Sequence, residues 1–469
     1  MAPHGPLAHA RPAYAGPAVS RFHFAANQAL METGNVHLVS GLPLPDAIRT
    51  TNRIGDLDPG LGRLVEEDWR SVYAWDADAQ VLTQTIDGYG RHLRRYGGMG
   101  CVLLPAGFDA PFFDAAAHAA PKPDHAPADF DIDTGALADA ALAAAVDHAF
   151  AAEAQTAALI VIRGGRVLAE RYGSGADADM MLASWSMGKS IAALLIGNLV
   201  GAGRLDLDAE APVAEWHADP DDPRRRIRLR DLVRMSSGLR FSGAREPAWA
   251  WGRGAADHQL VYSEAIDSYA FSIGQPAQHP PGTLGRYRNC DIATLGALVR
   301  RAAEADGIDP LLWPNRALLA PLGMRRMTLS PDAYGNIVYT GMNYGTARDW
   351  ARLGQLCLAR GAWRGEQLVP AAYIDFMATP APAWESNPEP LSDFHHLYGG
   401  GVWLNRRTAA APAPWALPED AYNFAGAGGQ RVFVVPSLDM VIVRHGHMRG
   451  VEPDAHTNAF LAALLRVVG

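Results

Sequence analysis

The sequence predicts an α+β fold in which helices flank an antiparallel sheet, and three observations support this prediction. Two apolar runs flank Arg163-Gly164-Gly165-Arg166, as in a β-hairpin over residues 156–173. Two further strand-like runs, QRVFVVP (430–436) and DMVIVRHG (439–446), lie near the carboxyl end. Helical patterns fill most of the chain between them. Strands at both ends with helices between favour one sheet that is split by a helical insertion.

The first 135 residues precede this predicted body. Residues 1–21 are rich in Ala, Pro and Gly, and we expect them to be disordered. Residues 22–135 form an N-terminal extension and a linker. Short apolar stretches alternate with turn residues in the extension, and the linker is rich in Pro, Asp, His and Ala. We expect the extension to pack on the body and Lys122, in the linker, to be solvated.

The body begins with three predicted elements. An Ala-rich helix covers residues 136–154, with Asp133 or Thr134 as its cap. The hairpin follows. The next helix carries no charge between Lys189 and Arg204, so it should be apolar on nearly all sides and buried in the core.

The remaining residues complete the predicted division of the chain. Residues 206–335 are interpreted as an all-helical insertion, and residues 136–205 and 336–469 as the α/β body. Within the second part of the body, we expect helices over 348–377, a strand over 398–404, the two carboxyl-terminal strands and a closing helix over 459–468.

Composition narrows the function classes. The 469 residues are 49% hydrophobic and 19% charged, as in ordinary globular proteins. A net charge of −9 offers no basic surface to nucleic acid. No apolar run has the length of a membrane span, and residues 1–20 lack the apolar segment of a secretory signal. We expect a cytoplasmic protein with no nucleic-acid or membrane partner; a periplasmic or secreted location stays open if the true start lies upstream.

Cysteine and lysine are both rare. Cys101, Cys290 and Cys357 have neither disulfide-like nor zinc-like spacing. Of the 41 lysine and arginine residues, Lys122 and Lys189 are the only lysines. Arginine stays protonated, whereas lysine can lose its proton when it is desolvated and then act as a base. Each lysine therefore needs an explanation.

Lys189 follows Ser186 by three residues, so the two side chains share one helix face about one turn apart. If Ser184 caps this helix, Ser186 lies in the first turn, where free N–H groups stabilise developing negative charge. The apolar helix would desolvate Lys189 and favour the neutral amine that a serine nucleophile needs as its base. The alternative is a buried lysine paired with a carboxylate. Residues 180–203 contain no acid, which disfavours it.

Three motifs in this order resemble the serine β-lactamase and penicillin-recognising superfamily. Ser186-Met187-Gly188-Lys189 is followed by Tyr287-Arg288-Asn289 and then, before the final strands, by Gly426-Ala427-Gly428-Gly429-Gln430. The phrases LDLDAEAPVAEW, DLVRMSSGL and TARDWARLGQL are also similar to the family. The resemblance covers roughly residues 136–469 and implies a β-lactamase-like fold. It is greatest to class C-like enzymes, particularly 6-aminohexanoate-dimer hydrolases and related esterases.

The resemblance implies a role for each residue of the first two motifs. Ser186 attacks an acyl carbon, and Lys189 takes its proton. Tyr287 relays a proton to the leaving amine or alcohol, and Asn289 helps to orient Lys189 or the substrate. No metal or organic cofactor is implied.

The third motif departs from the β-lactamase pattern. By resemblance, the backbone N–H groups of Ser186 and Ala427 hold the oxyanion, while Gly426 and Gly428 line the substrate site. β-Lactamases and peptidoglycan peptidases have Lys-Thr-Gly or His-x-Gly here, and its cation holds the substrate carboxylate. Residues 423–428 contain no cation, although Arg431 is close in sequence. A short amide or ester with an uncharged acyl side therefore fits better than a β-lactam or peptidoglycan.

Specificity is assigned to the loop over residues 241–263. In related hydrolases a mobile loop over the site closes an aromatic side chain on the substrate. Trp249, Trp251 and Tyr262 are the candidates here. Simple packing of these aromatics within the insertion is the alternative.

Two other charged or polar groups are given structural interpretations. The histidines at 395–396 and 445–447 lack a complementary ligand set with metal-like spacing, so no metal site is predicted. The arginine run over 224–230 is interpreted as a solvated, ion-paired segment rather than a phosphate site, because Asp219, Asp221 and Asp222 lie just upstream.

The sequence thus predicts a serine hydrolase that cleaves a small-molecule amide or ester through a covalent acyl-enzyme. A carboxylesterase, a D-amino-acid peptidase and a weak β-lactamase of the same fold stay open. A non-catalytic relative that uses the cleft for binding is another alternative, and the presence of Ser186, Lys189 and Tyr287 together argues against it. A homodimer is also left open.

Overall fold

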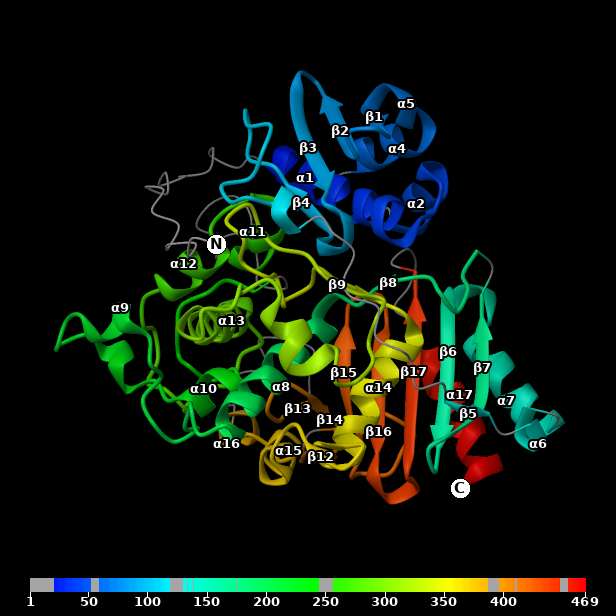
Figure 1. Cartoon of the computed structure of the whole chain (residues 1–469). Helices are drawn as coiled ribbons and strands as arrows, with labels where there is room; N and C mark the ends of the chain where they lie inside the picture. The colour runs from blue at the N-terminus through cyan, green and yellow to red at the C-terminus, as the bar shows by residue number, and fades with distance from the viewer. Residues whose placement is uncertain are drawn as a thin grey trace.

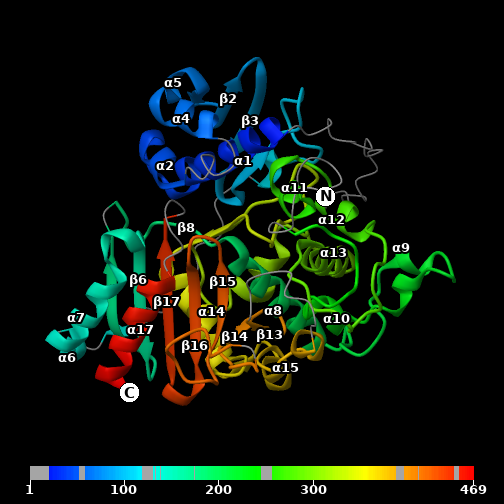
Figure 2. The same cartoon turned by 180° about the vertical axis from the view of Figure 1, so that it is seen from behind.

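The computed structural model describes residues 21–469 except 52–58, 119–129, 133, 138, 174, 244–255, 387–395, 410 and 448–453. A central sheet has helices on both faces, with a mostly helical region beside it and the amino-terminal elements above it (Figure 1). The opposite view shows α7 (Ala140–Ala149) and α17 (Asp454–Val468) in front of that sheet (Figure 2). The predicted α+β class is confirmed.

The central sheet joins strands from distant parts of the chain. Its order, β13-β14-β15-β16-β17-β6-β7-β5, places β6 beside β17, so that Val161 lies opposite Ile442. Neighbouring strands are antiparallel except β5 and β7. The strands are β5 (Asp131–Ile132), β6 (Thr156–Arg163), β7 (Arg166–Tyr172), β13 (Leu397–Tyr398), β14 (Trp403–Leu404), β15 (Tyr422–Gly426), β16 (Gln430–Val435) and β17 (Met440–Gly446).

Alternate side chains of β6 belong to two different cores. Leu159 and Val161 cluster with side chains of α7 and α17. Ile160 and Ile162 cluster instead with α8 (Gly188–Gly201) and α14 (Ala347–Leu358) on the other face. Because both faces are covered, the strand is a continuous apolar run rather than an alternating one. Each such side chain gains about 1.5–3 kcal/mol from burial.

The predicted hairpin is present as β6 and β7. Its turn residues Gly164 and Gly165 have φ of +57° and +75°. Two consecutive positive φ values match the twist of the flanking strands, and glycine adopts them without a Cβ clash. The Gly-Gly pair in the sequence therefore determines both the turn and the strand register.

Helices fill most of the chain between β7 and β13. After α8 they are α9 (Ala214–His217), α10 (Leu229–Val233), α11 (Asp257–Ser263), α12 (Ser268–Ile273), α13 (Asn289–Ala305), α14, α15 (Ala371–Met377) and α16 (Pro382–Glu385). Residues 206–335 are not all-helical, since β9 (Met327–Leu329) lies among them and pairs with β10 (Asn343–Gly345). β10 also pairs with β8 (Leu182–Ala183), which holds the segment after β9 close to the start of α8.

The amino-terminal elements form a second, smaller layered unit. They are α1 (Arg21–Asn35), a π-helical segment (Val36–Ser40), α2 (Leu44–Thr51), α4 (Pro59–Glu67), α5 (Trp69–Val72) and the sheet of β1 (Tyr73–Asp76), β2 (Val81–Ile86), β3 (Tyr89–Arg95) and β4 (Cys101–Leu103). This extension contacts the body. The amide of Cys101 donates to Ser330 Oγ (3.3 Å), and that of Phe112 donates to the carbonyl of Ala333 (2.8 Å). Lys122 lies outside the described residues.

Three predicted elements differ from the structure. The helix expected over 136–154 is shorter, because Asp139 leaves the helical conformation (φ −75°, ψ 113°) and its carboxylate caps α7. α6 (Thr134–Leu137) is a separate helical turn, and Asp133 lies outside the described residues.

The strand expected over 398–404 is the hairpin β13–β14. β15 was not predicted because its residues looked like part of a glycine-rich turn. A short hairpin of β11 (Ala362–Trp363) and β12 (Glu366–Gln367) forms a further small sheet. Within the described part of the chain, the single sheet that we expected is thus the largest of four.

Cys101, Cys290 and Cys357 are buried and free. Among the described residues, no helix combines the length and the apolarity that crossing a bilayer requires.

Candidate active site

Ser186 lies in a 3₁₀ turn (Trp185–Met187) immediately before α8. The preceding residue, Trp185, has φ of +47°, which is uncommon for a bulky side chain and costs about 1–3 kcal/mol. Ser184 does not cap the helix as predicted. Its hydroxyl donates to the carbonyl of Asn343 (2.7 Å) and so ties the turn to β10. Surrounding structure therefore holds Ser186 in this strained turn.

Gly188 allows the turn to approach the segment behind it. A Cβ at this position would lie 1.9 Å from Nδ2 of Asn343 and 2.4 Å from the carbonyl oxygen of Tyr339. Neither group has room to retreat, because both are buried. The third position of the Ser-x-x-Lys motif must therefore be glycine in this chain.

Lys189 points at Ser186 from the first turn of α8. Its Nζ is 2.7 Å from Ser186 Oγ and donates to the carbonyl oxygen of Thr340 at 2.9 Å. The side chain is 1% exposed, and burial lowers the lysine pKa well below its usual value. Among the described residues no carboxylate forms an ion pair with Lys189. The ion-paired alternative is thus not what the structure shows, and the amine is held next to the serine in the form that accepts a proton.

Tyr287 lies on the other side of the same pair of residues. It is hydrogen-bonded to Ser186, and the Lys189 Nζ is 4.8 Å from the centre of its ring. The ring also packs against Trp403 of β14, with 5.1 Å between the ring centres. Burial raises the tyrosine pKa above its usual value, although the hydrogen bond with Ser186 opposes this shift. Tyr287 therefore stays protonated at neutral pH. The structure brings Ser186, Lys189 and Tyr287 together.

By resemblance Asn289 orients Lys189 or the substrate, and the two hydrogen bonds of Lys189 go to Ser186 and Thr340 rather than to Asn289. Its Nδ2 donates to the carbonyl of His258 (2.8 Å) and to the hydroxyl of Tyr262 (2.9 Å). The Tyr262 hydroxyl in turn donates to the carbonyl of Thr340 (2.8 Å), which also accepts from Lys189. Asn289 thus reaches the lysine only through Tyr262 and Thr340.

Of the three candidate aromatic residues in the loop, the structure describes one. Trp249 and Trp251 lie outside the described residues. Tyr262 is on α11, 6% exposed, and packs edge-to-face against Trp185 with ring centres 5.7 Å apart. Because its hydroxyl already has two buried partners, Tyr262 acts here as a packing and bracing residue, which was the alternative interpretation, rather than as a mobile aromatic over the substrate.

His258 is a residue of this site that the sequence reasoning missed. It lies one helical turn before Tyr262 on α11, and its ring centre is 6.3 Å from that of Tyr287. Burial, and then the charge of Lys189, lower the histidine pKa to about 3. Its Nδ1 has no hydrogen-bond partner among the described residues. A neutral imidazole therefore faces the tyrosine and lysine. The i, i+4 spacing of His258 and Tyr262 was the available signal.

The glycine-rich turn between β15 and β16 lies directly against the segment that holds Ser184 and Ser186. A Cβ on Gly426 would be 2.1 Å from the carbonyl oxygen of Ser184, so only glycine allows this approach. Gly428 and Gly429 have φ of +77° and +72°. Ala427, the predicted oxyanion donor, is thus held in a turn that contacts the Ser184–Ser186 segment.

Two buried side chains hold this turn from behind. Arg444 of β17, 2% exposed, donates from Nη1 to the carbonyls of Gly428 (3.0 Å) and Gly429 (2.8 Å). Gln430 donates from Nε2 to the carbonyls of Gly428 (3.3 Å) and Gly446 (2.8 Å). The turn without a cation in its own sequence therefore has a buried cation behind it. Sequence spacing gave no signal for this, because Arg444 comes from the next strand.

Arg431 is directed away from a role as carboxylate anchor. Its Nη1 donates to the carbonyls of Gly426 (3.1 Å) and Gln430 (3.0 Å), and its Nη2 pairs with Asp454 (3.1 Å). The guanidinium also lies over the ring of Trp415, 5.3 Å from its centre. Its charge is therefore already balanced by a carboxylate at the start of α17.

The described residues contain no group of three His, Cys, Asp or Glu side chains arranged to hold a metal ion. His445 is fully buried, and its Nδ1 lies 3.1 Å from Oε1 of Gln430, so it belongs to the support of the glycine turn. His395 lies outside the described residues.

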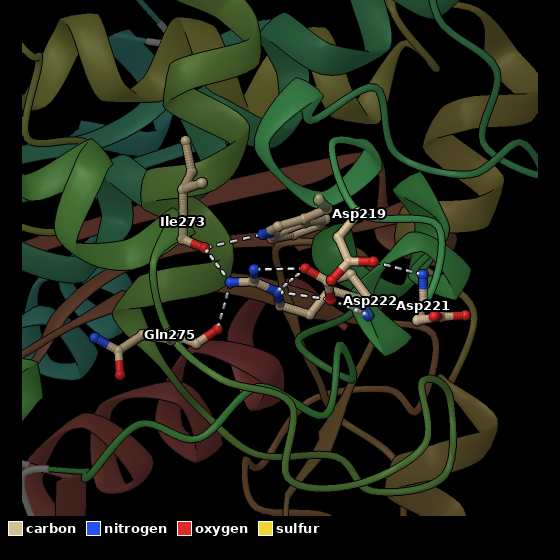
Figure 3. A network of polar contacts seen from close by, with 7 residues as sticks. Asp219, Asp221, Asp222, Ile273 and Gln275 are labelled. Carbon is tan, nitrogen blue, oxygen red and sulfur yellow. Dashed lines mark hydrogen bonds and ion pairs between the residues drawn. The ribbon is translucent and has the colours of Figure 1, made fainter.

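The arginine run is a structural segment, as predicted. Figure 3 shows Asp219, Asp221, Asp222, Ile273 and Gln275 around it. Arg224 pairs with Asp222 (2.6 Å) and donates to the carbonyls of Ile273 and Gln275 (both 3.1 Å). Asp219 accepts the backbone N–H of Asp221, so it shapes the turn rather than pairing with an arginine. The guanidinium of Arg224 is thus used to join this turn to the end of α12.

Comparison with known proteins agrees with the fold. The family model described as Beta-lactamase matches residues 140–466. A 6-aminohexanoate-dimer hydrolase of Paenarthrobacter ureafaciens is 24% identical over 304 residues, which are 62% of this chain and 72% of the relative. Among solved structures, a Bacillus anthracis protein assigned as a 6-aminohexanoate-dimer hydrolase has a TM-score of 0.57 at 19% identity, with 74% of this chain and 89% of that chain covered. A family VIII carboxylesterase has a TM-score of 0.53 at 16% identity, with 70% and 96% covered. Since the family model spans well over half of the sequence, this chain belongs to the Beta-lactamase family of hydrolases.

Proposed function

We propose that this protein is a serine hydrolase that cleaves a small amide or ester through a covalent acyl-enzyme, in the manner of a 6-aminohexanoate-oligomer hydrolase. One observation carries the proposal. The Nζ of a buried lysine that has no carboxylate partner among the described residues lies 2.7 Å from the hydroxyl oxygen of a half-exposed serine. A buried amine without a counter-charge is costly for folding, and activation of the serine accounts for its presence.

In the acylation step, Ser186 Oγ attacks the carbonyl carbon of the substrate, and its proton moves to Lys189 Nζ. The carbonyl oxygen becomes an oxyanion that the backbone N–H groups of Ser186 and Ala427 stabilise. The tetrahedral intermediate then collapses, and the C–N or C–O bond to the leaving group breaks. Tyr287 donates its proton to the leaving group and regains one from Lys189. The amine is then neutral again.

Deacylation uses the same groups with water as the nucleophile. Water attacks the acyl carbon and transfers a proton through Tyr287 and Lys189 to Ser186 Oγ as the ester bond breaks. The carboxylic acid product leaves, and the free serine is restored. No cofactor enters either step.

The charge around the site supports a substrate with an uncharged acyl side. The third motif has no cation in its own turn, Arg431 is paired with Asp454, and Arg444 is buried behind the turn. A β-lactam or a peptidoglycan stem peptide presents a carboxylate at this point. By their descriptions, the relatives include a 6-aminohexanoate-dimer hydrolase and a carboxylesterase. Amide and ester substrates are therefore both retained, with the D-amino-acid peptidase and weak β-lactamase as further alternatives.

A labelling experiment tests the reaction class. A fluorophosphonate probe, which reacts with activated serines, is expected to label the wild-type protein and not Ser186→Ala. A folded wild-type protein that stays unlabelled would favour the non-catalytic binding relative. Turnover of p-nitrophenyl esters, linear amide oligomers and nitrocefin then sorts the substrate class. Rapid nitrocefin turnover would contradict the argument from the missing cation.

A further inference from the structure

The helix α11 connects the active site with the N-terminal extension. Its residues His258 and Tyr262 lie beside Lys189 and Tyr287, as described above. Its C-terminal end packs on α1, which belongs to the extension. The Beta-lactamase family model begins at residue 140 and does not include α1. The contact therefore joins a part of the chain that the family model matches with a part that it does not match.

A buried polar junction lies at this contact. Asn27 of α1 donates from Nδ2 to Oε1 of Glu264 at 2.9 Å, and the two side chains are 0% and 2% exposed. The hydroxyl of Tyr89 donates to Asn27 Oδ1 (3.0 Å), and Arg91 donates to the Tyr89 oxygen (3.1 Å). Four side chains thus form a continuous chain of hydrogen bonds, with three of them supplied by the extension.

Glu264 is the residue of this junction that belongs to α11. This residue is the C-cap of α11, and its backbone N–H donates to the carbonyl of Leu260. Burial raises the carboxyl pKa, while the hydrogen bond from Asn27 and the charge of Arg91 oppose the shift. Because a buried carboxyl that loses its partners is unfavourable, the hydrogen bond from Asn27 and the charge of Arg91 help to hold the end of the helix in place. Phe24 of α1 adds an apolar contact to the cluster around Leu260.

Two hydrogen bonds that share one acceptor connect this helix with Lys189. Tyr262, two residues before Glu264, donates to the carbonyl of Thr340, and the same oxygen accepts from Lys189. A shift of α11 therefore moves the acceptor that orients the Lys189 amine. It would also admit water beside a lysine whose pKa is low because of burial.

We propose that the N-terminal extension completes the active site by fixing α11, and that Asn27 and Glu264 are positioning residues for Lys189. The inference rests on the proposed function for its catalytic meaning. The position and protonation of Lys189 are nevertheless measurable without any substrate. Loss of the junction is expected to raise the pKa of Lys189 toward its ordinary value and to shift the rise of the acylation rate with pH to a higher pH.

The composition of the chain offers a direct readout. Lys122 and Lys189 are the only lysines, so a protein labelled with [13Cε]lysine gives two signals in a pH titration by NMR. Asn27→Leu removes the donor to Glu264 with little change in volume. We expect the Lys189 signal to titrate about one pH unit higher in this variant, with Lys122 as an unchanged internal reference. At pH values below the wild-type pKa of Lys189, a rise of that size reduces the neutral fraction, and with it the rate of fluorophosphonate labelling, about tenfold.

Two further variants separate positioning from general destabilisation. Glu264→Gln in the Asn27→Leu background removes the uncompensated charge and is expected to restore part of the lost rate. Ser330→Ala removes a different hydrogen bond between extension and body, the one from the Cys101 amide, and should leave the Lys189 pKa unchanged. A folded Asn27→Leu protein with wild-type Lys189 titration would overturn the inference. An unlabelled wild-type protein would overturn the proposed function instead, and the NMR titration would still test the coupling between Asn27 and Lys189.

Discussion

The carbonyl oxygen of Thr340 lies 2.9 Å from the Nζ of Lys189 and accepts a hydrogen bond from it. A backbone carbonyl carries no net charge. Unlike a carboxylate, it therefore orients the amine without balancing the positive charge of the protonated form. The lysine is therefore directed toward Ser186 while burial keeps its pKa low. Each of the following predictions depends on this neutral, oriented amine or on the turns that face it.

Replacement of Lys189 by methionine should lower the rate of acylation and raise the stability of the fold at neutral pH. Acylation is expected to fall by about 10²–10⁴-fold, the usual contribution of a positioned base. The Lys189 amine is neutral in the folded state, whereas in the unfolded chain it is protonated below about pH 10.4. Proton binding to this amine therefore favours the unfolded state. Relative to wild type, Lys189→Met should therefore gain stability as the pH falls from 10 to 7. Thermal melts of wild type and Lys189→Met at both pH values check this. If the melting temperature of Lys189→Met at pH 7 is equal to or lower than that of wild type, the prediction is contradicted.

The pH dependence of kcat/KM should have an acid limb and no alkaline limb in the accessible range. Activity rises with pH as Lys189 loses its proton, and the low pKa of the lysine shifts this rise below pH 10. The raised pKa of Tyr287 keeps the proton donor intact at higher pH. Tyr287→Phe should reduce kcat by about 10²–10⁴-fold. A decline in wild-type activity between pH 8 and 10, with the protein still folded, would argue against a neutral tyrosine as the donor.

Gly188→Ala should impair both folding and acylation. The new methyl group would overlap with Asn343 and with the carbonyl of Tyr339, which is expected to cost about 1–3 kcal/mol and to displace the start of α8. Gly90→Ala is the matched control, because a Cβ there meets nothing closer than 3.9 Å. Chemical denaturation and labelling rates compare the two variants. Normal labelling of Gly188→Ala would show that the turn has more freedom than its packing indicates.

Gln430→Leu should lower kcat more than it raises KM. Gln430 supports the glycine turn through Gly428 and Gly446, and its loss should move the Ala427 N–H away from the developing oxyanion. Loss of one oxyanion donor typically costs about 10²–10³-fold in kcat. Asn405→Leu removes another buried amide, which braces Trp415 and Leu417, and serves as the control. Equal effects of the two substitutions on kcat would assign the loss to stability alone.

The sequence alone allowed much of this site to be predicted, because its motifs are local. Ser186 and Lys189 share one helix turn, so their contact follows from a spacing of three residues. The hairpin over 156–173 follows from its Gly-Gly turn and apolar flanks. Residues that come together only through tertiary packing were not foreseen. Thr340 supplies a backbone carbonyl, which carries no side-chain signal, and Arg444 reaches the glycine turn from a neighbouring strand.

The incorrect predictions have similar causes. Ser184 looked like a helix cap from its position, but β10 provides an acceptor for its hydroxyl in Asn343. Asn289 was assigned by resemblance to the orientation of Lys189 or the substrate, and α11 offers its amide two partners, the carbonyl of His258 and the hydroxyl of Tyr262. In both cases a strand or helix distant in sequence competes successfully for a polar side chain. Local patterns predict which of these residues lie in contact when they share one helical turn, and they do not predict the residues from distant elements that hold them.

The most direct test of the central claim is the mass of the covalent intermediate. A slowly hydrolysed p-nitrophenyl ester is mixed with the protein, turnover is stopped with acid, and the protein is analysed by intact-mass and peptide-mapping mass spectrometry. We predict one acyl group per chain, on the peptide that contains Ser186, and none on Ser186→Ala. Sustained ester turnover with the acyl group on another residue, or undiminished turnover by Ser186→Ala, would contradict the account.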